Sequence, residues 1–94
     1  MSDPIQPTSS FKFNPDVTVR VMDNEAVLLN VRTGAYFGLN KVGTVIWQLY
    51  SEGKTVAEVV SNLCERYGIA SERATTDVQA LTQKLLEKEL LRTG

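Results

Sequence analysis

The order of apolar and polar residues along the chain predicts three strands ahead of three helices. Valine alternates with polar or longer side chains over residues 16–22, a period of two that is typical of a strand. Residues 25–31 are apolar on both faces, which favours a central strand, and residues 35–39 form a shorter third strand. Asp23–Asn24 and Thr33–Gly34 separate these strands as tight turns, because Asp, Asn and Gly tolerate positive φ. The two turns predict a meander in which the first and third strands are both edges.

Three amphipathic helices are expected after the sheet, since apolar residues recur there every three or four positions. Asn40 is suited to cap the first helix, and Thr55 with Glu58 forms a T-x-x-E capping box at the start of the second. The pattern predicts an α+β fold, winged-helix-like, in which a three-stranded antiparallel β-meander is followed by three α-helices. The expected helices span residues 40–52, 55–67 and 71–88.

A single domain is expected over residues 14–94, because a chain of 94 residues has room for one hydrophobic core. Residues 1–13 contain two prolines and three serines and predict a flexible N-terminal tail, whose Phe11 and Phe13 are able to contact the domain. At the other end, Leu90–Leu91 is expected to pack back on the core after the polar end of the third helix.

Charge and cysteine content limit the cellular compartment and the classes of binding partner that are expected. Lysine and arginine number 10 against 11 acidic residues, and the basic residues are scattered, which argues against a nucleic-acid partner. The single cysteine allows no internal disulfide, which fits a reducing compartment. The N-terminus lacks the features of a secretory signal, and no apolar run reaches the roughly 20 residues of a membrane span. We therefore expect a cytoplasmic protein with no membrane partner.

No catalytic residue, cofactor or metal site is expected. The chain has no histidine, which removes the commonest general base and metal ligand. Cys64 lies on the apolar face of the second helix, where a small core residue is a better interpretation than a nucleophile. Trp47 and Tyr50 share a helix face with apolar neighbours and are expected in the core rather than against a nucleobase. No phosphate-binding glycine motif is present, so the protein is not expected to be an enzyme.

The predicted elements favour a peptide-binding groove. An edge strand leaves N–H and C=O groups unpaired, and an amphipathic helix beside it supplies an apolar floor for an added strand. The alternative is that the leucine stripe of the third helix is only its core face. If that helix lies beside the third strand, the floor is Phe37, Val78, Leu81 and Leu85, and the polar rim is Asp77, Thr82, Lys84 and Lys88.

From about residue 16 to residue 91 the sequence resembles the PqqD-like family, whose members are also called RiPP recognition elements. Glu89 departs from the pattern, because many relatives have glycine there, before a Leu-Leu pair. The resemblance rests on the order and spacing of five segments: the strand run Val27–Val31, T-G-A-Y-F-G-L-N at Thr33–Asn40, I-W-Q-L at Ile46–Leu49, G-K-T-V-A-E at Gly53–Glu58 and D-V-Q-A-L-T-Q-K-L-L at Asp77–Leu86.

The resemblance implies that the leader segment of a ribosomally made precursor peptide docks as an extra strand on the third strand, against the third helix. Chains of this size resemble the standalone leader-binding protein of lasso-peptide biosynthesis, which acts with a leader peptidase and an ATP-dependent macrolactam synthetase. The chain is then expected to present its precursor without catalysis, as a monomer or weak dimer. The expected contact residues are Tyr36, Phe37, Gly38, Asp77, Val78, Leu81, Lys84 and Leu85.

Three alternative functions fit parts of the pattern. Within the family, the chain resembles a PqqD-type chaperone that presents its peptide to a radical SAM enzyme. A winged helix of this topology also fits a nucleic-acid-binding domain, with Tyr36–Phe37 as an aromatic platform, although no basic residues accompany it. A free strand edge also favours a structural domain that dimerises.

Overall fold

The structure, a computed structural model, describes residues 5–6 and 8–93 of the chain. Strands β2, β3 and β4 form a three-stranded antiparallel sheet in sequence order, and a second strand pair joins β1 to β5. The predicted α+β fold, a meander followed by three helices, is confirmed. In chain order the elements are β1 (Phe11–Phe13), β2 (Val17–Met22), β3 (Glu25–Asn30), β4 (Tyr36–Leu39), α1 (Lys41–Ser51), α2 (Val56–Tyr67), α3 (Ser71–Glu87) and β5 (Leu91–Thr93).

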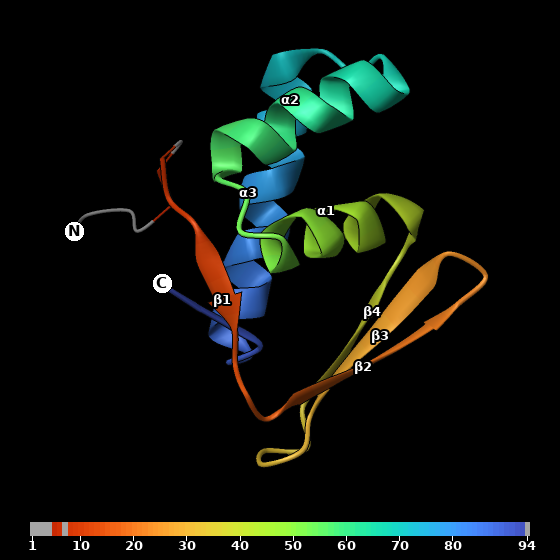
Figure 1. The fold of residues 1–94 in the computed structure, drawn as a ribbon, viewed down its shortest axis with the longest axis vertical. Coiled ribbons are helices and arrows are strands. Elements are labelled where there is room, and N and C mark those ends of the chain that lie inside the picture. The colour runs from red at the N-terminus through yellow and green to blue at the C-terminus, as the bar shows by residue number, and fades with distance from the viewer. Residues whose placement is uncertain (1–4, 7, 94) are drawn as a thin grey trace.

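The helices lie on one side of the meander, and the β2–β3 hairpin projects away from them (Figure 1). In this view α3 runs behind α1 and α2, and the β1–β5 pair lies on the side away from the hairpin tip. The β1–β5 pair and the meander are therefore two separate sheets.

The hairpin between β2 and β3 has the turn that its sequence predicts. Asp23 and Asn24 have φ values of 52° and 67°, the left-handed conformation that a two-residue turn of this kind requires at both central positions. Along β3, burial alternates with the two-residue period of a strand, and Ala26, Leu28 and Asn30 face the core. The register of the sheet follows from this buried face.

The helix starts also follow the predicted capping. The side chain of Asn40 accepts a hydrogen bond from the backbone N–H of Gly43 at 2.8 Å. Thr55 and Glu58 form the expected capping box, with reciprocal bonds of 2.8 Å and 3.2 Å. The backbone N–H of Thr55 donates to the carboxylate of Glu58 and lowers the pKa of that carboxyl.

The predicted flexible tail over residues 1–13 includes Phe11–Phe13, which form strand β1 in the structure. It pairs antiparallel with β5, so this part of the chain is fixed by main-chain hydrogen bonds. Phe11 is buried, and its ring meets that of Tyr50 edge-to-face with centroids 5.3 Å apart. This apolar anchor explains why a segment rich in turn-forming residues is ordered here. Residues 1–4 and 7 of the predicted tail lie outside the described residues.

Glu89 turns the chain from the end of α3 into β5. Its φ is 58°, a conformation that glycine adopts without strain, which accounts for the glycine expected here from the family resemblance. Leu90 and Leu91 are then buried, as predicted. The backbone N–H of Asn14 donates to the carbonyl of Leu90 at 3.1 Å, so the start of the chain also holds this turn.

The core lies between the meander and the helices and contains one buried side-chain hydrogen bond between helices. The hydroxyls of Tyr50 on α1 and Thr82 on α3 are 2.8 Å apart. Burial raises the pKa of the Tyr50 phenol, although the bond to Thr82 opposes this. Trp47 is half-buried and meets Phe13 with ring centroids 6.1 Å apart.

Among the described residues, no helix has the length and apolar character needed to cross a membrane.

Candidate functional site

The outer edge of β4 carries main-chain groups that no other strand uses. The N–H of Asn30 donates to the carbonyl of Ala35 at 2.8 Å, which fixes the alternation of hydrogen bonds between β3 and β4. By this alternation the main-chain groups of Phe37 and Leu39 face β3. The N–H and C=O groups of Tyr36 and Gly38 point to the outer edge. Within residues 5–6 and 8–93, no other segment pairs with this edge. It can therefore accept a further strand.

A groove of about 850 Å³ lies between this edge and α3. Its floor and ends come from the last residues of β4, the first turns of α1 and the loop from α2 to α3. The lining is mostly apolar, and a space of this size accommodates several side chains. The groove and the free edge of β4 therefore form one continuous site.

Half of the predicted contact residues line this groove. Phe37 and Gly38 of β4 and Asp77 and Leu81 of α3 are all part of its surface. Phe37 and Leu81 are half-buried and pack against the core with part of their surface. Their remaining surface is exposed in the groove, so both stay predicted contacts.

Val78 and Leu85 are corrections to the predicted site. Both side chains are fully buried in the core and are absent from the groove lining. Thr82, predicted on the rim, is equally buried and bonds to Tyr50. The core face of α3 and its groove face lie side by side, and only Leu81 of the predicted leucine stripe belongs to both.

Tyr36 and Lys84 lie at the margin of the site. Tyr36 is 71% exposed, and its side chain is on the outer face of the sheet, so only its main-chain groups face the edge of β4. Lys84 is exposed in the last turn of α3 and is outside the groove lining. Both remain predicted contacts.

The prediction missed the part of the groove formed by α1 and the α2–α3 loop. Val42 and Ile46 lie one helical turn apart on α1, and their spacing could have shown a shared face, although not which element it meets. Leu39 of β4 and Ile69 of the loop complete this apolar end. Arg73 on α3, also missed, lies four residues before Asp77 on the same helix face.

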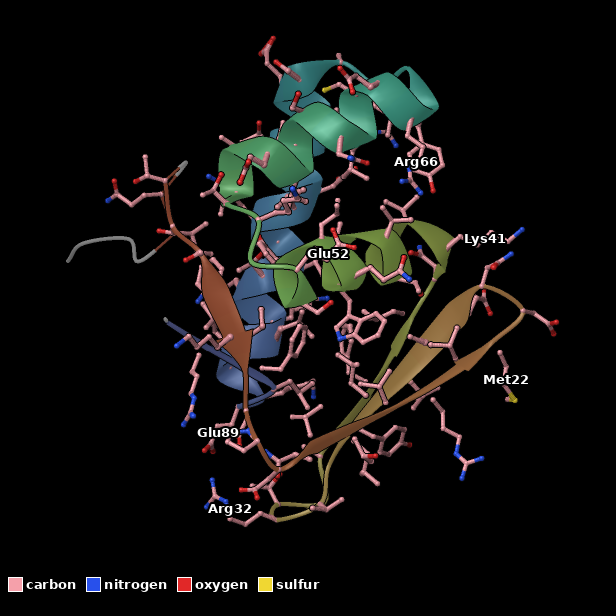
Figure 2. All side chains as sticks on the ribbon, viewed as in Figure 1. Met22, Arg32, Lys41, Glu52, Arg66 and Glu89 are labelled. Carbon is pink, nitrogen blue, oxygen red and sulfur yellow. The ribbon has the colours of Figure 1, made fainter. Side chains whose placement is uncertain are left out.

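The charges around the groove are few and dispersed. Its lining contains one ion pair, with Nε of Arg73 3.9 Å from Oδ2 of Asp77, and both side chains are more than half exposed. Lys41 and Arg66 point outward on one side of the molecule, whereas Arg32 and Glu89 lie together near the β3–β4 turn (Figure 2). A site of this kind binds through main-chain hydrogen bonds and apolar contacts rather than through charge.

The positions of the metal-ligating and thiol side chains bear on the expected chemistry. No cluster of His, Cys, Asp and Glu able to hold a metal ion occurs among the described residues. Cys64 is half-buried between α2 and α3, where it packs against the core and lies outside the groove beside β4. The predicted interpretation of Cys64 as a small packing residue agrees with this position.

The comparisons with known proteins agree with this geometry. The family model of coenzyme PQQ synthesis protein D (PqqD) matches residues 25–91, which is well over half of the chain. The chain belongs to the PqqD family. The match begins at β3, so β1 and β2 of this PqqD-family protein lie outside it. A comparison with curated proteins gave no match.

Two solved structures are similar to this PqqD-family chain. TbiB1 in complex with the TbiA(β) leader peptide is 38% identical, with a TM-score of 0.82, and the alignment covers 86% of this chain and 94% of TbiB1. Lasso peptide synthetase B1 complexed with the leader peptide is 30% identical, with a TM-score of 0.82, and the alignment covers 89% of this chain and 99% of that chain. The fold is therefore shared over almost the whole length of both relatives.

Proposed function

We propose that this protein binds the leader segment of a lasso-type precursor peptide as an added strand on β4. The observation that carries the proposal is a free strand edge beside an apolar groove, which is the arrangement that β-augmentation requires. Both similar structures are complexes with a leader peptide, which supports the same class of ligand for this chain.

The geometry of β4 defines how such a peptide is held. The peptide exchanges hydrogen bonds with the outward main-chain groups of Tyr36 and Gly38. Its side chains alternate between the groove and the outer face of the sheet, because successive residues of a strand point to opposite faces. On the groove side they meet Phe37, Ile69 and Leu81, so apolar side chains at every second peptide position are favoured.

The proposed role is presentation of the precursor, without catalysis. The groove lining offers no thiol, hydroxyl or imidazole to attack a peptide bond, and its two charged residues pair with each other. The bound leader holds the rest of the precursor near a leader peptidase and an ATP-dependent macrolactam synthetase. Tethering raises the effective concentration of the substrate at these enzymes without any new contact to the reacting atoms.

Leu81→Asp tests the groove. The substitution places a carboxylate against the apolar floor, and we expect the affinity for the TbiA(β) leader peptide to fall at least about tenfold. Fluorescence anisotropy measures the affinity, and circular dichroism measures the fold. Thr76→Asp is the matched control, because Thr76 is an exposed residue of α3 outside the groove lining.

The outcomes separate the proposal from its alternatives. If the Leu81→Asp protein folds and binds as tightly as the wild type, the peptide does not bind in the groove. An equal loss in both variants would assign the effect to charge on α3. The wild-type protein is also tested with the leader encoded by a short open reading frame beside its gene. If it binds neither this leader nor the TbiA(β) leader, the proposed function is wrong.

A further inference from the structure

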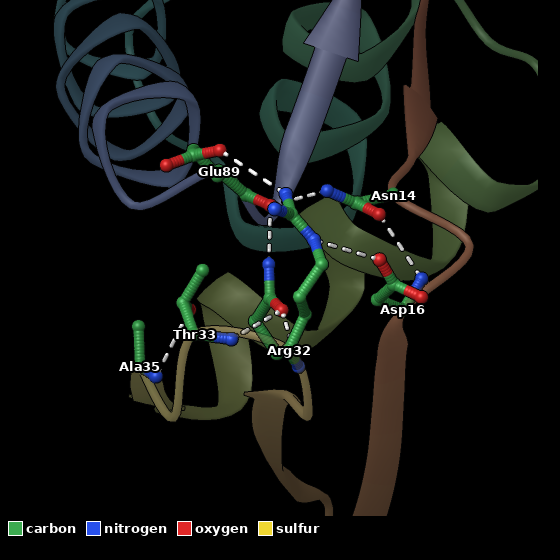
Figure 3. A network of polar contacts seen from close by, with 7 residues as sticks. Asn14, Asp16, Arg32, Thr33, Ala35 and Glu89 are labelled. Carbon is green, nitrogen blue, oxygen red and sulfur yellow. Dashed lines mark hydrogen bonds and ion pairs between the residues drawn. The ribbon is translucent and has the colours of Figure 1, made fainter.

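Three segments that are far apart in the sequence meet at the backbone carbonyl of Glu89 (Figure 3). The Nδ2 atoms of Asn14 and Asn30 each donate to this oxygen at 3.1 Å. Arg32 forms two ion pairs beside this oxygen. Its Nε is 3.1 Å from Oδ2 of Asp16, and its Nη2 is 3.5 Å from Oε1 of Glu89. We name these five residues the Glu89 junction.

Asn30 has a second role, because it shapes the turn that leads into β4. Its Oδ1 accepts hydrogen bonds from the backbone N–H groups of Arg32 at 2.9 Å and Thr33 at 3.2 Å. The side chain is fully buried, and both its oxygen and its nitrogen have partners. A buried amide whose oxygen and nitrogen both have partners is held firmly, so this one side chain connects the β3–β4 turn to the end of α3.

The junction lies beyond one end of the groove described above, whose lining stops at Phe37 on β4 and at Leu81 on α3. β4 and α3 are the two walls of that groove, and they run in opposite directions. The start of β4 follows the β3–β4 turn, which Asn30 connects to the end of α3. Leu39, at the end of β4, shares the groove lining with Ile69 and Arg73 near the start of α3. The α2–α3 loop therefore closes one end of the groove, and the junction joins the two wall elements beyond the other end.

We propose that Asn30 and Glu89 are positioning residues for peptide binding, and that their hydrogen bond sets the separation of the groove walls before the peptide arrives. This inference rests on the proposed function. As an edge strand, β4 is paired along one side only. Its position relative to α3 therefore depends on β3, on the packing of Phe37 and Leu39, and on the contacts at its ends. Without the Asn30 bond, a smaller fraction of molecules has the binding-competent groove, and the apparent affinity falls in the same proportion.

Asn30→Asp is compared with Asn14→Asp, and only Asn30→Asp also places a carboxylate in a fully buried position. Asn30→Asp keeps the side-chain oxygen that accepts from the N–H groups of Arg32 and Thr33. Asn14→Asp keeps the side-chain oxygen that accepts from the N–H of Asp16. Each variant loses one N–H donor to the carbonyl oxygen of Glu89. Only Asn30 is joined to a wall of the groove. We expect Asn30→Asp to raise the dissociation constant for the TbiA(β) leader peptide about tenfold, and Asn14→Asp to change it less than about twofold.

Hydrogen exchange in the free protein adds a readout that general destabilisation does not reproduce. In Asn30→Asp the amides of β4 and of the last turn of α3 should exchange faster than in Asn14→Asp, while the amides of α2 exchange alike in both. Equal affinities in the two variants, or unchanged exchange in β4, would overturn the proposal.

Arg32→Gln keeps the inference testable if Asn30→Asp does not fold. Arg32 is exposed, and the substitution breaks the ion pair to Glu89 that also joins the turn to α3. We expect a two- to threefold weaker affinity, on the order of what one exposed pair supplies, whereas Asp16→Asn, which leaves that pair intact, keeps the wild-type value. Equal affinities in these two variants would also overturn the inference. Failure of the wild type to bind any leader would instead remove the proposed function itself.

Discussion

At the scale of single residues, buried polar side chains connect elements that the apolar core alone would leave free to shift. The hydroxyl of Tyr50 joins α1 to α3 through Thr82, and the amide of Asn30 joins the β3–β4 turn to the end of α3. Both helical and strand walls of the groove are thus held by specific bonds as well as by apolar contacts. Single substitutions at these positions are expected to be informative, since each removes a defined bond.

Tyr50→Phe is expected to lower the free energy of unfolding by about 1 kcal/mol, which is the usual net value of a buried hydrogen bond. Thr82 keeps its bond to the carbonyl of Val78, at 2.6 Å, so its hydroxyl is not left without a partner. Urea unfolding measures the change. The exposed Tyr67→Phe is the control and should alter the free energy by about 0.5 kcal/mol or less. Equal effects of the two substitutions would contradict this assignment.

The same variants test how stability depends on pH. Burial raises the pKa of Tyr50 above the ordinary value of 10.0. Below pH 10 the phenol is protonated in both folded and unfolded chains, and its contribution to stability is fully present. As the pH rises further, the unfolded chain loses this proton first, so the unfolded state is favoured and stability falls. Above pH 10 the wild type should therefore lose more stability than Tyr50→Phe, and parallel curves would contradict this.

At the scale of elements, β4 and β2 are both edges of the meander, but only β4 borders the groove. Gly38→Pro is expected to weaken leader binding at least about tenfold, because proline removes an outward N–H donor and its ring blocks the edge. The fold should remain, since this N–H does not bond to β3 and a side chain at Gly38 meets no atom within 4 Å. Isothermal titration measures the affinity.

Val21→Pro is the matched control on the other edge. The N–H of Val31 donates to the carbonyl of Asp16 at 2.9 Å, and this alternation leaves the N–H of Val21 pointing away from β3. The substitution therefore removes the same type of donor from β2, and leader affinity should not change. A loss of affinity in Val21→Pro, with none in Gly38→Pro, would place the peptide on the opposite edge.

Elements with local signals could be predicted from the sequence, and those that depend on distant contacts could not. The Thr55–Glu58 capping box and the Asp23–Asn24 turn carry their own chemistry, so both appear where they were expected. Strands β1 and β5 have three residues each, too few for a period, and they form only because they pair with each other. Their pairing crosses nearly the whole chain.

The candidate site shows the same limit at the level of α3. The apolar stripe of this helix is plain in the sequence, but its division between core and groove depends on how the helix is rotated against β4. Leu81 lines the groove, whereas Val78 and Leu85, three and four residues away, are fully buried. A helix in isolation does not determine this rotation, because the packing of α1 and the α2–α3 loop sets it.

At the scale of the whole molecule, leader binding is expected to stabilise the fold, because the groove exists only in the folded chain. At a leader concentration of about 100 times the dissociation constant, the gain is about 2.7 kcal/mol, which raises the melting temperature of a domain of this size by about 10 °C or more. Differential scanning fluorimetry with the TbiA(β) leader peptide measures the shift. A scrambled leader of the same composition should give none, and equal shifts would point to non-specific binding.

The same measurement in high salt should give a similar shift. The groove lining has a single ion pair, and the chain as a whole has a net charge of −1, so little of the binding energy should be electrostatic. A nucleic-acid-binding winged helix would instead show steep salt dependence. Family membership and dispersed charge both favour the peptide ligand.

Strand β1 runs beside β5 so that Phe11 faces Thr93, which brings residues from the two extremes of the sequence into contact. A circularly permuted gene could begin at the exposed Gly53 between α1 and α2. Its linker would have to keep the segment before Phe11, because Ile5 is buried in the core and the carbonyl of Ser9 accepts a hydrogen bond from the N–H of Val56. The rearranged polypeptide would then expose its new termini on a helical loop, and a fluorophore or fusion partner attached there would report on the protein from a second direction.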